Sequence, residues 1–177
     1  DESPPIISAS GLASTNQYCY IDFSEGVFSS NSGEGGIELN DLEYTFDPNG
    51  GNCSSVNILE IKNYTGALLS GGETLVYAYV QLNSSPSGSE TIIFAPADGS
   101  SIFDQAGNPM HPSSVTGAMT FNASAVIESV FLDPNNEYLD IIFSNGIYSD
   151  PQQLQTIQLN DFQISMNSNS GLSLIHI

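Results

Sequence analysis

Residues 18–29 read YCYIDFSEGVFS and residues 138–149 read YLDIIFSNGIYS, so one pattern of apolar and polar residues occurs twice, 120 positions apart. The same offset aligns residues 6–51 with residues 126–171 without a gap, and 15 of these 46 pairs are identical. Unrelated sequence would give roughly three identities. Repetition at a fixed period is typical of tandem modules. The sequence therefore predicts a complete module over residues 1–124 and the N-terminal part of a second repeat over residues 125–171.

The first module is rich in short β-type segments. Runs of Val, Ile, Phe, Tyr and Thr are separated by Gly, Pro, Asn and Ser, which is the pattern of strands and turns. We expect strands at residues 5–10, 17–23, 38–46, 56–61, 74–82, 90–95 and 118–122. In the run 74–82 (TLVYAYVQL), Val76, Ala78 and Val80 alternate with Leu75, Tyr77 and Tyr79, so each set lies on one face. This pattern predicts an all-β fold, an immunoglobulin-like two-sheet sandwich followed by the first strands of a second module.

The final residues 172–177 (LSLIHI) have a different origin in our interpretation. They resemble the translation of a transposon end sequence used to prepare sequencing libraries, so we expect a non-native tail. The alternative is an apolar strand that takes the place of residues 56–61 in the second repeat.

The charge balance excludes several partners. Twenty acidic residues face one basic residue, Lys62, giving a formal net charge of −19. Nucleic-acid recognition needs Lys and Arg against phosphate, so no nucleic acid is expected. Anionic membrane surfaces would repel the chain, and no apolar run is long enough to span a bilayer, so no membrane insertion is expected. Such self-repulsion favours screening by cations. We therefore expect an extracellular or cell-surface protein.

The two cysteines leave two interpretations open. Cys19 and Cys53 form an even pair within one module, and a disulfide between them would suit an oxidising compartment. The second repeat has Leu139 in place of Cys19, so such a bridge would not be essential to the fold. The alternative is a pair of free buried thiols.

Several motifs together resemble a known class of repeat. The run YIDFSEGV (20–27) is followed in order by LND (39–41), SETI (89–92) and IFDQAGN (102–108). This resembles the bacterial Ig-like repeats found in tandem in very large secreted and cell-surface proteins, including adhesins. The resemblance implies acidic residues near one end of the module, contributed by the Phe-Ser-Glu and Asp-x-x-Gly-Asn elements.

Catalytic patterns are not evident, and we expect no enzyme. The one histidine considered for catalysis is His111, which lies in the Pro-rich loop NPMHP (108–112) and is interpreted as an exposed loop residue. No HExxH, CxxC, phosphate-binding or dinucleotide motif occurs in the sequence. With twenty acidic residues, a pair of carboxylates has almost no specificity as a sign of glycosidase chemistry.

Calcium is the candidate ligand with the clearest chemical basis. It takes six to eight oxygen ligands from carboxylates, amides, carbonyls and water. The segment 98–108 offers Asp98, Asp104 and Asn108 around a tight loop, and Glu25 follows the second expected strand. We predict these four residues as metal ligands. The alternative is turn chemistry, in which Asx side chains bond to their own backbone.

Two further patterns have a structural and a functional interpretation. Asn40-Asp41 recurs as Asn160-Asp161, and we interpret it as a polar turn before the strand that starts near Leu42. Tyrosines could form a platform for sugars, although cross-strand packing is the simpler role. The residues concerned are Tyr18, Tyr20, Tyr44, Tyr77 and Tyr79.

These observations favour a non-catalytic spacer repeat of an extracellular, adhesin-like surface protein, stiffened by calcium. Its expected partners are neighbouring repeats of the same chain. The alternatives are a carbohydrate-binding or enzyme-accessory module, whose partners would be glycans, and a self-assembling extracellular filament subunit that other copies complete by strand exchange.

Overall fold

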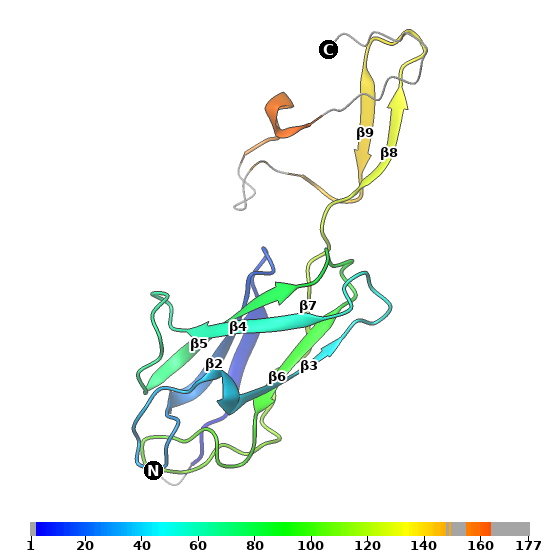
Figure 1. Ribbon diagram of the computed structural model, residues 1–177. Helices are drawn as coiled ribbons and strands as arrows, with labels where there is room; N and C mark the ends of the chain where they lie inside the picture. The colour runs from blue at the N-terminus through cyan, green and yellow to red at the C-terminus, as the bar shows by residue number, and fades with distance from the viewer. Residues whose placement is uncertain (1–2, 148, 150–154, 164–177) are drawn as a thin grey trace. The chain divides into compact units, whose positions relative to one another are not determined.

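The computed structural model describes residues 3–147, 149 and 155–163. This part of the chain is all-β: its strands pair in antiparallel sheets, and its helical segments are short 3-10 turns (Figure 1). The strands are β1 (Ile7–Leu12), β2 (Tyr18–Val27), β3 (Leu42–Asp47), β4 (Val56–Lys62), β5 (Glu73–Leu82), β6 (Thr91–Pro96), β7 (Met119–Thr120), β8 (Ile127–Leu132) and β9 (Leu139–Phe143). The 3-10 turns are η1 (Leu39–Asp41) and η2 (Leu159–Asp161).

The chain divides into two compact units, Asp1–Ala123 and Ser124–Ile177. This division lies one residue before the expected module boundary. Within the first unit, one sheet has the strand order β1-β2-β5-β4 and the other has the order β3-β6-β7. Strands that are distant in sequence therefore lie side by side, as β2 and β5 do in the first sheet.

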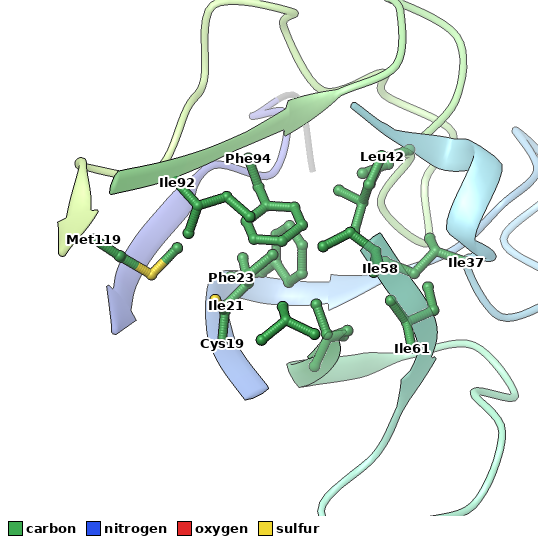
Figure 2. Packing of buried hydrophobic residues seen from close by; sticks show 14 of the residues in the cluster. Cys19, Ile21, Phe23, Ile37, Leu42, Ile58, Ile61, Ile92, Phe94 and Met119 are labelled. Carbon is green, nitrogen blue, oxygen red and sulfur yellow. The ribbon is translucent and has the colours of Figure 1, made fainter. Parts of the chain in front are cut away.

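Both sheets of the first unit contribute side chains to one hydrophobic core (Figure 2). Ile21 and Phe23 of β2 are buried together with Ile92 and Phe94 of β6. In β5, buried and partly or fully exposed residues alternate from Leu75 to Gln81, so Val76, Ala78 and Val80 face the core. The alternation predicted for residues 74–82 is confirmed, because side chains on a strand point to opposite faces in turn.

Two expected strands differ from the structure. The segment 38–46 begins with the η1 turn, and its strand starts only at Leu42. The segment 118–122 contains only the two-residue strand β7. Before β7, the Thr116 amide donates to the Phe94 carbonyl at 2.9 Å, but the Phe94 amide donates to the Thr116 hydroxyl at 2.8 Å, so a side chain supplies one of the two bonds of this pair. A run of β-forming residues indicates a strand but does not reveal where a side chain accepts a backbone hydrogen bond of the strand.

The hairpin of β8 and β9 repeats the hairpin of β1 and β2 pair for pair. In the first hairpin, the register runs from Ile7 opposite Phe23 to Leu12 opposite Cys19. Adding 120 to each residue number gives the register of the second hairpin, including the irregularity after its first pair. Sequence repetition and backbone pairing therefore share one offset.

The turns inside these hairpins are also equivalent. Asn16 and Asn136 have φ values of 58° and 60°, in the left-handed region that Asn tolerates better than most residues. The amide of Asn16 donates to the carbonyl of Ala13 at 2.9 Å, and that of Asn136 donates to Asp133 at 2.8 Å. The same local chemistry produces the same turn in both repeats.

The η1 and η2 turns extend this correspondence to residues 38–41 and 158–161. The Glu38 amide donates to the Asp41 carboxylate at 2.7 Å, and the Gln158 amide donates to Asp161 at 2.8 Å. The interpretation of Asn40-Asp41 as a turn before a strand at Leu42 is confirmed. The expected strand of the second repeat after this turn lies largely outside the described residues, as does the proposed tail 172–177.

Both cysteines of the first unit are buried free thiols. The Cys53 sulfur lies 3.2 Å from the Ser55 carbonyl oxygen and 3.1 Å from the Asn83 side-chain oxygen, so its single S–H has two acceptors within reach. Burial raises the pKa of the Cys19 thiol to about 12. The structure therefore shows two buried thiols, the alternative interpretation, and not a disulfide.

Candidate functional site

The loop of residues 104–108 brings together two of the four predicted calcium ligands. Asp104 is 1% exposed, and its carboxylate accepts the Asn108 amide at 2.8 Å and the Asn108 side-chain nitrogen at 2.7 Å. Burial alone would raise the pKa of Asp104, but these bonds and the amides of Ala106 and Gly107 hold it below its ordinary value. Because each carboxylate oxygen already has a donor, this geometry favours the turn role of Asp104.

The other two predicted ligands lie in separate local environments. Asp98 begins its own turn, in which its carboxylate accepts the amide of Ser100 at 2.7 Å and the hydroxyl of Ser100 at 3.0 Å. Glu25 lies near the end of β2, in the irregular stretch between Asp22 and Val27. Asp98 also lies near Asp41: burial, Glu38 and Asp98 raise the pKa of Asp41, against the bond from the Glu38 amide.

Within the described ranges, no group of three or more His, Cys, Asp or Glu side chains is arranged to hold a metal ion. Calcium binding by Glu25, Asp98, Asp104 and Asn108 stays a prediction. In the same part of the chain, no helix has the length and apolar character needed to cross a bilayer.

Glu90 is the most enclosed acidic residue in the part of the chain that the structure describes, and no sequence motif marked it as a candidate site. Its side chain is 0% exposed at the start of β6. Its carboxylate accepts backbone N–H groups of Cys53 at 2.9 Å, Ser87 at 3.0 Å, Gly88 at 3.1 Å and Ser89 at 3.2 Å. The Ser87 hydroxyl donates to it as well, at 3.2 Å. We call these donors the Glu90 cage.

The Glu90 cage joins two segments that are distant in sequence, one at Cys53 and one at residues 87–90. Burial alone would raise the pKa of Glu90, but the cage lowers it to about 2, because N–H donors stabilise the ionised carboxylate. The cage leaves no room beside it: a Cβ added at Gly51 would overlap the Glu90 carboxylate. All donors to Glu90 come from the protein, so its hydrogen bonds hold the loop before β4 against the segment that leads into β6. The run SGSE (87–90), small residues before an acid, was the available sequence signal.

Four of the five tyrosines considered above lie on one outer face of the sheet β1-β2-β5-β4. Tyr18 and Tyr20 alternate with buried residues in β2, and Tyr77 and Tyr79 do so in β5. Tyr18 lies opposite Tyr79, and Tyr20 lies opposite Tyr77. We call these four residues the tyrosine face. Tyr44 is not part of it, since it lies in β3 of the other sheet.

Ring contacts tie the tyrosine face together. The rings of Tyr18 and Tyr77 meet edge to face at 5.2 Å, and those of Tyr18 and Tyr79 lie 5.8 Å apart. The Lys62 ammonium lies 5.7 Å from the Tyr79 ring centre and forms a 2.6 Å ion pair with Glu60. This arrangement confirms cross-strand packing between tyrosines and also presents aromatic surface beside a charged pair.

His111 is exposed, as expected for a loop residue. Its Nδ1 atom lies 2.6 Å from the Ser113 hydroxyl and accepts the Ser113 amide at 3.1 Å. Because Nδ1 receives a backbone N–H, this contact closes a local turn of the loop.

Comparisons with known proteins add no relative. The chain matches no protein-family model, no curated protein and no solved structure. The similarity to bacterial Ig-like repeats therefore stays a prediction based on the motifs quoted above.

Proposed function

We propose that this chain is part of a tandem array of immunoglobulin-like modules and serves as a spacer in an extracellular, adhesin-like surface protein. The observation that carries the proposal is the 120-residue offset, which relates the registers of the two hairpins as well as their sequences. Because the module recurs with the same turns, the number of repeats would set the length of the array, which supports a spacer role.

Strand order supports the immunoglobulin-like assignment of the first unit. In constant-type immunoglobulin domains, strands named in chain order from A to G form one sheet A-B-E-D and another C-F-G. The first unit has the orders β1-β2-β5-β4 and β3-β6-β7, which correspond strand for strand. The core shared by β2, β5, β3 and β6 supports packing of one sheet on the other.

Charge supports an extracellular setting for the proposed array. With a net charge of −19, neighbouring modules repel one another unless cations screen them. Repulsion between like-charged modules favours an extended array, and calcium at module ends would stiffen it. Calcium is the part of the proposal that rests on residue types alone.

Small-angle X-ray scattering tests the spacer role. Polypeptides that carry one, two and four copies of residues 5–124 in series should have maximum dimensions that grow about in proportion to the number of copies. Each should be measured with EDTA, with calcium and with magnesium at one ionic strength, so that stiffening by calcium separates from screening. A maximum dimension that stays nearly constant from two to four copies would contradict the spacer role.

The tyrosine face favours carbohydrate binding as a second candidate function, because sugars stack on aromatic rings. Titration with a panel of oligosaccharides, followed by NMR, would test it. Binding that is lost in the double variant Tyr20→Ala, Tyr77→Ala but kept in Tyr64→Ala would support this function. Tyr64 is a matched control, since its ring is 81% exposed in the loop after β4, outside the tyrosine face. Absence of binding across the panel would contradict carbohydrate binding as a function of the tyrosine face.

A further inference from the structure

Part of the tyrosine face forms a straight row across the sheet β1-β2-β5-β4. Gly11 of β1 lies opposite Tyr20 of β2. Tyr20 in turn lies opposite Tyr77 of β5, and Tyr77 lies opposite Lys62 of β4. Neighbouring strands are about 4.8 Å apart, so the row from Tyr20 to Lys62 is about 10 Å long. This length is enough to contact more than one ring of an oligosaccharide.

The Tyr20 side chain lies across the backbone of Gly11. A Cβ added at Gly11 would lie 2.5 Å from the Tyr20 Oη atom and 2.6 Å from its Cζ and Cε1 atoms. Glycine leaves room for the tyrosine ring here, because a strand glycine lets another group approach its backbone closely. The backbone of β1 therefore supports the ring, while 37% of Tyr20 is exposed to solvent.

The second hairpin shows that the fold does not need this arrangement. Its register matches that of the first hairpin, and the pair equivalent to Gly11 and Tyr20 is Phe131 and Asp140. The hairpin therefore forms with or without a tyrosine over a glycine at this point. Hairpin formation does not account for the exposed, supported ring of Tyr20, whereas contact with a ligand would.

Charged groups beside the row can exchange hydrogen bonds with a ligand. The Lys62 ammonium lies 2.6 Å from the Glu60 carboxylate and 5.7 Å from the Tyr79 ring centre. Asp22 follows Tyr20 by two positions in β2 and lies on the same face. The carboxylates accept hydrogen bonds, and the ammonium donates them. With a net charge of −19, the chain repels anionic ligands, so this surface favours a neutral ligand with apolar faces and hydroxyl groups.

We propose that Tyr20, Tyr77 and Lys62 bind a neutral glycan whose pyranose rings carry equatorial hydroxyls. Such rings present C–H groups on their flat faces, which stack on the two tyrosines, and hydroxyls at their rim, which bond to Lys62 and Glu60. The inference rests on carbohydrate binding, the second candidate function above, and names the class of ligand and the residues that hold it.

Isothermal titration calorimetry with the full chain of 177 residues tests the class of ligand. The neutral probes are cellohexaose, xylohexaose and chitohexaose. The matched anionic probe is cellohexaose whose primary alcohols are oxidised to carboxylates, because it keeps the ring stereochemistry and adds only charge. At least one neutral probe should bind saturably at millimolar concentrations, with an affinity that hardly changes with salt. The oxidised probe should bind at least about tenfold more weakly than cellohexaose at low ionic strength.

Gly11→Ala tests the residues without removing a ring. The new methyl group would displace the Tyr20 ring, so binding should weaken by about three- to tenfold, as it should in Tyr20→Ala. Tyr20→Phe keeps the ring and should bind like wild type, and Tyr64→Ala is the control outside the tyrosine face. Circular dichroism checks the fold of each variant. Phe131 in β8 shows that the hairpin accepts a side chain at the Gly11 position.

Three results would overturn the inference: no saturable binding of any neutral probe, equal or tighter binding of the oxidised probe at low ionic strength, or unchanged binding in both Gly11→Ala and Tyr20→Ala. The first would also contradict carbohydrate binding as a function. The other two would leave that function with a different class of ligand or different residues. All three leave the scattering test of the spacer role unaffected, so the failures are distinguishable.

Discussion

Glu90→Gln isolates the charge of the Glu90 cage, because glutamine keeps the size of the side chain and replaces one carboxylate oxygen by a group that cannot accept a hydrogen bond. One carboxylate oxygen accepts the amides of Cys53 and Ser87, and the other accepts those of Ser87, Gly88 and Ser89. In either orientation of the new amide, at least one backbone N–H loses its acceptor and faces an NH2 group.

The magnitude follows from how many of these donors water can reach. Cys53 is buried, so its N–H stays unpaired when the NH2 group takes the position that it faces, whereas Ser87 and Ser89 are exposed and water replaces part of their bonds. An unsatisfied buried donor costs about 1–3 kcal/mol, and loss of bonds to a charged acceptor adds to this. We expect the free energy of unfolding to fall by about 2–4 kcal/mol. For a chain of this size, the melting temperature should fall by about 6–12 °C.

The pH dependence of this difference has a defined direction. The pKa of Glu90 is lowered to about 2 in the folded protein, below its ordinary value of 4.5. Its contribution to stability is therefore present above about pH 5 and is lost as pH falls from there towards 2. The difference in stability between wild type and Glu90→Gln should be constant near neutral pH and should shrink over that acidic range.

Thermal unfolding of the full chain, followed by circular dichroism from pH 2 to pH 8, measures both effects. The matched control is Glu43→Gln, since Glu43 is an exposed acid of β3 and its change should alter stability by less than about 0.5 kcal/mol. A melting temperature within about 2 °C of wild type at neutral pH would refute the reasoning. So would a difference that persists undiminished to pH 2.

Calcium should raise the melting temperature of the full chain by several degrees over EDTA at fixed ionic strength, and equal effects of magnesium and calcium would reduce this to charge screening. Cys19 and Cys53 should resist a thiol reagent such as DTNB in the native protein and react in urea, and rapid labelling of native protein would contradict their burial. Phe94→Ala should lower the free energy of unfolding by about 3–5 kcal/mol in urea titrations, because Phe94 is completely buried in the hydrophobic core, and a loss below about 1 kcal/mol would contradict its place there. Asp41→Ala should cost about 1 kcal/mol in the same assay, since it removes the acceptor that closes η1, and unchanged stability would show that the turn forms without it.

Features that depend on neighbouring residues could be predicted from the sequence. The alternation of β5 follows from the two-residue period of a strand, and the turn at Asn40-Asp41 follows from a short polar side chain that bonds to a nearby amide. The repeat could be predicted for the same reason, because similar local patterns of apolar and turn residues build hairpins of the same register, and the shared register of β1-β2 and β8-β9 is the structural counterpart of the 120-residue offset.

Contacts between distant segments were decided by tertiary structure. The Glu90 cage needs the amide of Cys53, 37 positions away, and nothing near Glu90 in the sequence indicates that this donor will face it. Asp104 was predicted as a calcium ligand from its residue type, but folding buries its carboxylate among the donors of its own loop. The sequence by itself determined which strands, hairpins and turns form locally, and that the first hairpin and the 3-10 turn recur after 120 residues. Only the tertiary structure decided which acids are enclosed, because burial depends on segments that meet only in the folded chain.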